Sequence, residues 1–124
     1  MIKLEITGVH FEITEQVRSY AQKRIGSLDK YLPRNARAGV LGHVVLIEEQ
    51  GKAKNRYSAE AKMTFPHGEV TAKESTISMY AAIDIVEEKL KAQILKHKEK
   101  TEDRRKSQRM LRRMKAFRFN QQDQ

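Results

Sequence analysis

The sequence predicts a small α+β domain in the order β-α-β-β-β-α, a four-stranded sheet with two parallel-packed helices on one face. Four stretches alternate apolar and polar residues or are largely apolar, as strands are. Two longer stretches place apolar residues at helical spacing. Each helix has one stripe to bury, so both are expected to cover the same sheet face, while the other face is polar enough to meet water. Double-stranded RNA-binding folds have the same element order.

The first strand and the first helix follow from local patterns. A strand is expected at residues 2–6, where Ile2, Leu4 and Ile6 alternate with polar residues. A helix is expected from residue 15 to residue 31, because Thr14 is a good N-cap and Pro33 stops it. Gly26 is expected to cost ~1 kcal/mol against alanine, which is tolerable if another segment packs close there. The helix is expected to bury Val17, Ala21, Leu28 and Leu32, with Tyr20 and Ile25 on its flanks.

Three further strands are expected at residues 39–48, 56–65 and 69–75. Short connections around Gly51 and Pro66 join them, which predicts an antiparallel meander. The middle strand has the clearest alternation. Its inward residues are expected to be Tyr57, Ala59, Ala61, Met63 and Phe65, and its outward residues Ser58, Glu60, Lys62 and Thr64.

The last predicted element is a helix over residues 78–100, with Ser78 as its N-cap. At ~100° per residue, one side carries apolar residues and a second row carries lysines. The apolar stripe comprises Met79, Ile83, Val86, Leu90 and Ile94 and continues to His97. The cationic row comprises Lys89, Lys96 and Lys100. This helix therefore offers one face to the core and another to an anionic partner.

Composition predicts one domain, residues 1–100, followed by a basic tail, residues 101–124. The chain has 124 residues, 39% of them apolar, which supports a single modest core. It has no cysteine, no apolar run of membrane length and no apolar signal region in MIKLEITG. We therefore expect a soluble cytoplasmic protein that does not associate with membranes.

Charge points to nucleic acid. Lys and Arg number 25 against 16 Asp and Glu, giving a net charge of +9 and a pI near 9.9. The tail is more strongly basic than the rest of the chain. Its Met110, Met114 and Phe117 have helical spacing, but so charged a segment is expected to order only on a polyanion or partner.

Nothing in the sequence indicates an enzyme, a cofactor, a metal site or a small-molecule substrate. The histidines, at positions 10, 43, 67 and 97, lack metal-ligand spacing, and the six glycines are isolated. No nucleophile motif is present. The acids of the last helix, Asp84, Glu87 and Glu88, are expected to pair along it, as Glu87 with Lys91.

The cations of the two helices suggest a single surface. Taken alone, each row is typical of a solvated helix face. If the helices pack side by side, Lys23, Arg24 and Lys30 of the first lie beside Lys89, Lys96 and Lys100 of the second. Several such cations give salt-sensitive, sequence-tolerant binding to phosphates, which fits folded RNA recognised by shape and backbone.

The sequence also resembles a known family. MYAAID (Met79 to Asp84) followed by KLKAQILKHKEK (Lys89 to Lys100) looks like the signature of ribosome hibernation promoting factors and ribosome-associated inhibitors. The segment ITGVHFEITEQVRSYAQKRIGSLDKYL (Ile6 to Leu32) is similar to that family's first strand and helix. Two separated motifs in the right order cover roughly residues 1–100.

The resemblance implies a short-form factor that binds the small ribosomal subunit in the channel of messenger RNA and the A- and P-site transfer RNAs. Such a factor competes with these RNAs, inhibits translation and protects idle ribosomes in stationary phase or stress. By motif position and charge, the expected RNA-binding residues are Arg18, Lys23, Arg24, Lys30, Lys89, Lys96, Lys98 and Lys100, with Arg104 and Arg105 of the tail.

Some features depart from the family pattern. Ser78 stands where relatives usually have Asp, and Ser27 where they often have Lys. The second, dimer-forming domain of long members is expected to be absent, and the tail is basic where some short inhibitors are acidic. The sequence therefore leaves open whether this protein promotes the pairing of ribosomes into dimers or keeps them single. Two alternatives also remain: a general double-stranded RNA-binding module or RNA chaperone, and a protein-interaction module that docks through Met110, Met114 and Phe117.

Overall fold

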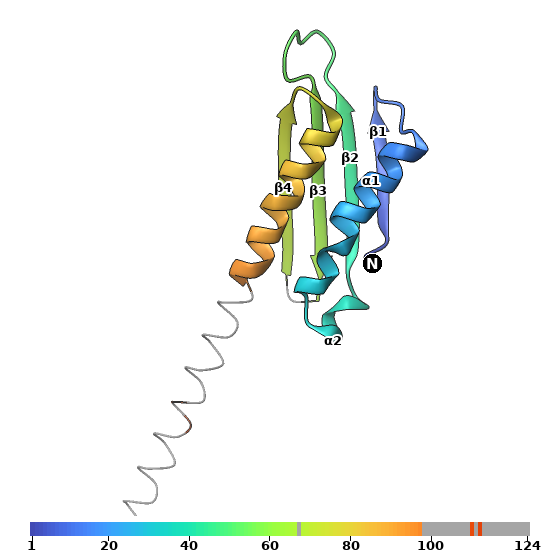
Figure 1. Cartoon of the computed structure of the whole chain (residues 1–124). Helices are drawn as coiled ribbons and strands as arrows, with labels where there is room; N and C mark the ends of the chain where they lie inside the picture. The colour runs from blue at the N-terminus through green and yellow to red at the C-terminus, as the bar shows by residue number, and fades with distance from the viewer. Residues whose placement is uncertain (67, 98–109, 111, 113–124) are drawn as a thin grey trace, which may run out of the picture. The chain divides into compact units, whose positions relative to one another are not determined.

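The computed structural model describes residues 1–66, 68–97, 110 and 112 (Figure 1). Its contacts divide the chain into two units, Met1–Ile94 and Leu95–Gln124. The first unit contains the whole sheet. In the second unit the described side chains are Leu95, Lys96, His97, Met110 and Arg112, and all five are exposed.

The sheet has four strands in the spatial order β1-β2-β3-β4. Their bounds are β1 (Leu4–Val9), β2 (Leu41–Glu48), β3 (Tyr57–Phe65) and β4 (Gly68–Thr76). β2, β3 and β4 pair antiparallel, which confirms the predicted meander. β1 pairs parallel with β2, because the segment between them crosses over through a helix. The α+β class and the four-stranded sheet are thus as predicted.

The segment between β1 and β2 holds three helical pieces, α1 (Glu15–Gly26), the 3-10 turn η1 (Ser27–Tyr31) and α2 (Arg34–Arg37). Val17 N–H donates to Thr14 Oγ1 at 3.2 Å, so Thr14 is the predicted N-cap. The first helix was expected to continue to residue 31, but the α-helix ends at Gly26 and a 3-10 turn begins at Ser27. The Ser27 hydroxyl donates to the carbonyls of Lys23 and Arg24, competing with the regular helical bonds.

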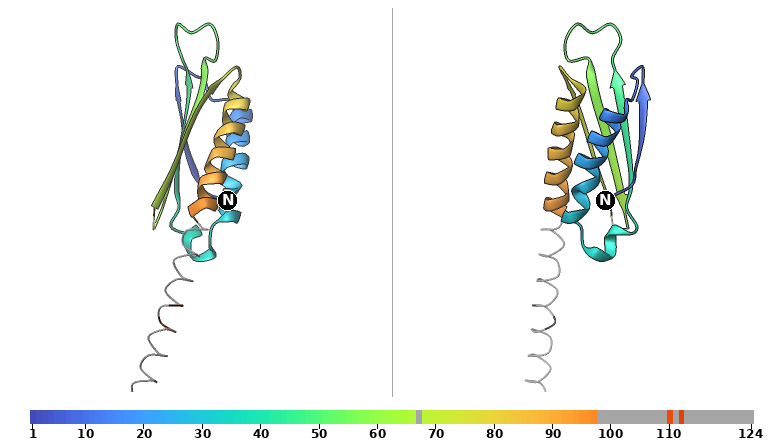
Figure 2. Two further views of the ribbon diagram at one scale, coloured as in Figure 1. Left: turned by 90° about the vertical axis from the view of Figure 1, so that its left-hand side faces the viewer. Right: turned by 45° about the vertical axis from the view of Figure 1, so that its right-hand side comes forward.

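Residues 79–97 form a second long helix. Ala81 N–H donates to Ser78 Oγ at 3.1 Å, which confirms Ser78 as its N-cap. Residues 98–100, over which this helix was expected to continue, lie outside the described residues. Figure 2 shows α1 and the 79–94 part of this helix side by side on one face of the sheet, as predicted.

The predicted apolar stripes of both helices form the core of the first unit. The buried residues of α1, η1 and the following loop include Val17, Ala21, Leu28 and Leu32, and those of the second long helix are Met79, Ala82, Ile83, Val86, Leu90 and Ile94. Ile25, expected on a flank, is fully buried. Ser58, expected in solvent, is also fully buried, because Glu49 and Ser75 cover it and bond its hydroxyl at 3.0 and 2.6 Å.

Gly26 is needed because the N-terminal segment passes close to α1. A Cβ atom at this position would lie 2.5 Å from Gln22 Nε2 and 3.0 Å from the carbonyl oxygen of Ile2. Ile2 N–H donates to the Gly26 carbonyl at 2.8 Å. The backbone of Ile2 therefore packs directly against the backbone at Gly26.

Two glutamines cover the open edges of the sheet. The Gln22 side chain accepts from Leu4 N–H at 3.3 Å and donates to the Ile2 carbonyl, at the edge where β1 begins. The Gln93 side chain accepts from Thr71 N–H at 3.2 Å and donates to the Thr71 carbonyl at 2.6 Å, on β4. Each amide thus takes backbone groups that another strand would otherwise pair with.

Replacing Gln93 by alanine is expected to promote self-association, because Thr71 then presents a free N–H and C=O at an exposed edge. Gln16→Ala, at an exposed position of α1, is the matched control. Light scattering after size exclusion, at increasing protein concentration, measures the effect. Equal behaviour of the two variants would show that the glutamine does not protect the edge.

Candidate nucleic-acid interface

The second long helix presents two different flanks to its neighbours. One flank faces α1 and η1 and carries Tyr80, Asp84, Glu87 and Lys91, which contact residues of those elements. The other flank faces β4 and carries Lys89 and Gln93, which bond to that strand. Lys89 and Lys91 therefore lie on different flanks of this helix.

Lys89 belongs to the β4 flank. Its ammonium lies 2.6 Å from Glu74 Oε2 and donates to the Lys73 carbonyl at 3.2 Å. The prediction that Lys89 lies beside Lys23, Arg24 and Lys30 is therefore wrong. A step of ~100° per residue orders side chains around a helix, but it does not say which flank meets the neighbouring helix.

The α1 flank forms what we call the inter-helix cluster: Tyr20, Arg24, Tyr80, Asp84 and Glu87. The Tyr20 hydroxyl donates to Asp84 Oδ1 at 2.5 Å. Arg24 Nε lies 3.3 Å from the same carboxylate oxygen, and Arg24 Nη1 lies 3.4 Å from Glu87 Oε2. The Tyr20 and Tyr80 rings meet edge to face, with centroids 4.9 Å apart. Arg24, predicted to face RNA, is thus already paired with two carboxylates.

Glu87 also differs from expectation, since its ion pair reaches across to Arg24 and not along the helix to Lys91. Burial raises the pKa of the Glu87 carboxyl, while the positive charge of Arg24 acts in the opposite direction. At Glu74, the hydrogen bond from Lys89 lowers the pKa of the carboxyl. The pKa values of the two carboxyl groups, one beside each flank of the helix, are thus shifted in opposite directions.

In a carboxyl-carbon NMR titration, Glu87 is expected to titrate at a higher pH than Glu74. Because the pKa of Glu87 is raised on folding, its contribution favours the fold at low pH and is lost as the pH rises through its folded pKa. For Glu74, whose pKa is lowered, the contribution is lost as the pH falls through its folded pKa. Lys89→Met should raise the Glu74 pKa and leave Glu87 unchanged; a reversed order in the native protein would contradict the geometry.

Three cations surround a shallow groove between α1 and β1. Leu4 and Ile6 form its apolar floor, and Lys3, Arg18 and Lys23 stand around it. None of these cations forms an ion pair with another described residue. Arg18 and Lys23 were predicted to bind RNA, whereas Lys3 was not.

Two further cations share one aromatic ring where η1 meets the second long helix. The ammonium groups of Lys30 and Lys91 lie 5.3 and 5.2 Å from the centroid of the Tyr31 ring. The hydrogen bond with Tyr31 raises the pKa of Lys91. Two like charges at one ring favour an anion beside them. Lys91 was not among the predicted RNA-binding residues, because its position beside Lys30 depends on how the helices pack.

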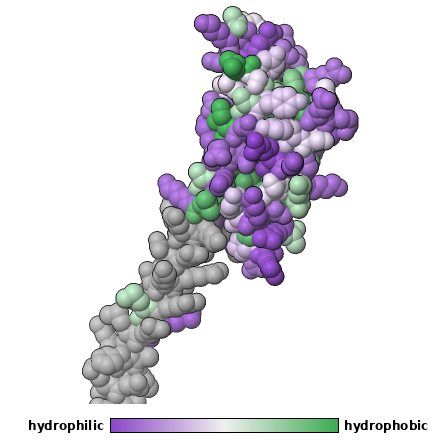
Figure 3. Space-filling model, viewed as in Figure 1, coloured by the Kyte–Doolittle hydropathy of each residue, from purple (hydrophilic) through white to green (hydrophobic). Residues whose placement is uncertain are grey.

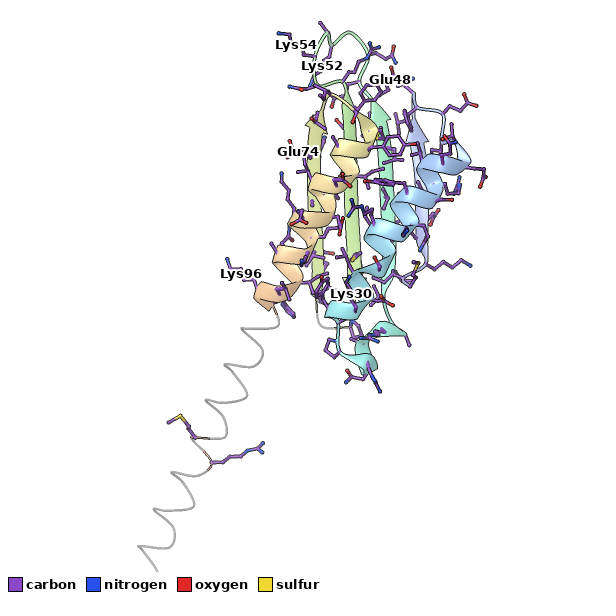
Figure 4. All side chains as sticks on the ribbon, viewed as in Figure 1. Lys30, Glu48, Lys52, Lys54, Glu74 and Lys96 are labelled. Carbon is purple, nitrogen blue, oxygen red and sulfur yellow. The ribbon has the colours of Figure 1, made fainter. Side chains whose placement is uncertain are left out.

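The remaining predicted site residues lie elsewhere. Lys96 belongs to the second unit and is exposed (Figure 4). Lys98, Lys100, Arg104 and Arg105 lie outside the described residues, as does most of the tail. Lys52 and Lys54 stand on the β2–β3 hairpin, at the opposite end of the sheet from Lys30 (Figure 4). Lys52 pairs with Glu49.

The helix side of the first unit is largely hydrophilic (Figure 3). Within the described residues, no group of three or more His, Asp or Glu side chains is arranged to hold a metal ion. In the same part of the chain, no helix has both the length and the apolar character to cross a membrane. What the surface offers is cations and aromatic rings, the groups that contact phosphates and bases.

Comparison with known proteins agrees with this chemistry. The profile of the family described as "Sigma 54 modulation protein / S30EA ribosomal protein" matches residues 4–102. The chain is 38% identical over 100 residues to "Ribosome hibernation promotion factor" of Lactococcus lactis, covering 79% of this chain and 50% of that protein. It is 30% identical over 99 residues to "Ribosome hibernation promoting factor" of Pseudomonas putida, covering 80% of this chain and 89% of that protein.

A solved structure gives the same result. The crystal structure of the Thermus thermophilus Protein Y N-terminal domain matches with a TM-score of 0.62 at 30% identity, over 75% of this chain and 93% of that one. This chain spans half the length of the Lactococcus relative and nearly all of the Pseudomonas relative. The resemblance read from the two sequence motifs is thus confirmed. The chain belongs to the family of Sigma 54 modulation and S30EA ribosomal proteins, which includes the ribosome hibernation promoting factors.

Proposed function

We propose that this protein is a cytoplasmic hibernation factor that binds the small ribosomal subunit where messenger RNA and the A- and P-site transfer RNAs bind. By occupying this region it excludes those RNAs, inhibits translation and protects idle ribosomes in stationary phase or stress. It acts by binding, without catalysis, cofactor or small-molecule substrate. Family membership supports the ribosome as partner.

One observation carries the proposal. Four cations on the helix side of the first unit, Arg18, Lys23, Lys30 and Lys91, form no ion pair with a described residue. Their charge is available to phosphates, and each contact with a phosphate releases counterions. Arg24 and Lys89 already have carboxylate partners, so their binding to phosphate requires exchange of that partner.

The basic tail extends this contact in our proposal. Residues 101–124, with Arg104 and Arg105, lie against ribosomal RNA or ribosomal proteins near the messenger channel, since the segment is rich in cations. Deleting residues 104–119 is expected to lower both the affinity for the small subunit and its salt dependence. Unchanged affinity and salt slope in the deleted protein would remove the tail from the interface.

Co-sedimentation tests the main proposal. The protein is expected to pellet with purified small subunits, to be released as salt rises, and to compete with transfer RNA for the P site. Protein that stays in the supernatant at low salt would refute the proposal. Equal affinity for a generic RNA duplex and for the subunit would favour the second candidate, a double-stranded RNA-binding module. The four cations named above, which form no ion pair with a described residue, could also contact the phosphates of a duplex.

A further inference from the structure

The middle of the helix side differs in character from its surroundings. The inter-helix cluster holds one cation, Arg24, and two acids, Asp84 and Glu87. Its carboxylates repel phosphate. Three cations that form no ion pair with a described residue lie outside the cluster: Lys23 on α1, and Lys30 and Lys91 at Tyr31. The cluster is therefore suited to a different part of a nucleic acid than the phosphate backbone.

Tyr80 is the exposed ring of this cluster, with 41% of its surface open to solvent. Its ring meets the Tyr20 ring at an interplanar angle of 80°, so Tyr20 covers at most one face of it. Tyr20 is itself held in place, because its hydroxyl bonds to Asp84 and Arg24 lies 5.4 Å from its ring centroid. Tyr80 thus presents a supported aromatic face whose placement costs little entropy on binding.

Asp84 provides a hydrogen-bond acceptor one helical turn from Tyr80. Its Oδ1 atom accepts from the Tyr20 hydroxyl and lies 3.3 Å from Arg24 Nε, which itself donates to the Tyr20 oxygen. No hydrogen bond to its Oδ2 atom is present among the described residues, and the side chain is 43% exposed. A carboxylate oxygen left open beside an aromatic ring accepts from the amino group of a base, as Asp and Glu accept from cytosine.

We propose that Tyr80 and Asp84 bind one unpaired RNA base, with Tyr80 stacking on the base and Asp84 Oδ2 accepting from its exocyclic amino group. The neighbouring phosphates of that strand lie on the surrounding cations. Adenine, cytosine and guanine carry an exocyclic amino group and uracil does not, so the site disfavours uracil. This inference rests on RNA being the partner in the proposed function.

The experiment uses the full chain and short single-stranded RNAs with one 2-aminopurine, alone and within a duplex. The native protein is expected to quench 2-aminopurine fluorescence in the single strand and not in the duplex. Tyr80→Leu is expected to abolish the quenching and to weaken single-strand binding about fivefold or more, with an unchanged salt slope. Tyr80→Phe keeps a ring and should bind as the native protein does. Ile77→Ala, at another exposed apolar position, is the control.

A second experiment tests Asp84 through the preference between bases, because a loss of packing alone would not change that preference. The native protein should bind oligocytidine more tightly than oligouridine, and Asp84→Asn should reduce this ratio towards one. Equal quenching by native protein and Tyr80→Leu, or no preference between the two oligonucleotides, would overturn the inference. If Tyr80→Leu weakens binding to whole subunits only, the ring contacts a ribosomal protein and the inference is wrong. Failure of the native protein to bind subunits at all would refute the proposed function instead.

Discussion

Replacing Leu46 by alanine is expected to lower the free energy of unfolding by about 3 kcal/mol, a large part of the ~5–15 kcal/mol typical of a domain. Leu46 lies in the central strand β2 and is fully buried. Its register partners on the two adjacent strands are Gly8 and Ala59, which are too small to fill the space left by the lost side-chain atoms. The resulting cavity therefore stays largely open.

Leu41→Ala is the matched control, because it makes the same substitution in the same strand. Leu41 is 67% exposed, so its loss is expected to change the free energy of unfolding by less than ~0.5 kcal/mol. Urea titration followed by circular dichroism measures both variants. Similar midpoints for the two would contradict the placement of Leu46 in the core.

Reversing two charges, Arg18→Glu with Lys23→Glu, is expected to weaken binding to the small subunit roughly 100-fold, at ~1.5 kcal/mol for each lost charge-assisted contact. Neither cation has a carboxylate partner in the described part of the chain, so the substitutions break no ion pair there. The slope of log affinity against log salt should fall by about two, one for each lost phosphate contact.

The control for net charge is Lys52→Glu with Lys54→Glu, on the β2–β3 hairpin (Figure 4). This pair makes the same change in net charge at the other end of the sheet from Lys30. Affinity close to that of the native protein is expected. If both double variants lose affinity equally, the effect is long-range attraction by net charge, and the helix side is not the contact surface.

Local signals in the sequence predicted most of the fold. The caps at Thr14 and Ser78 are recognisable because a side-chain oxygen satisfies a backbone N–H only a few residues away. The meander followed from short connections between alternating stretches. The errors at Ile25 and Ser58 have a tertiary cause, since their burial comes from segments distant along the chain or from neighbouring strands.

The candidate site was predicted less completely. Arg18, Lys23 and Lys30 are exposed, as predicted, although Lys30 lies in η1 and not in the first helix, and their contact with RNA stays a prediction. Lys91 and the cluster around Tyr80 were missed. Only packing brings Lys91 to the ring of Tyr31 and Arg24 to Asp84 and Glu87, over separations of 60 or more residues.

The sequence by itself determined the order of the elements, the two buried stripes, the excess of positive charge and the family. The tertiary structure decided which of the described cations form ion pairs. Helical periodicity fixes the angle between two side chains on one helix, but the neighbour that each flank meets depends on how the helices pack on the sheet. That packing gave Lys89 and Arg24 carboxylate partners, whereas Arg18, Lys23, Lys30 and Lys91 form no ion pair within the described part of the chain.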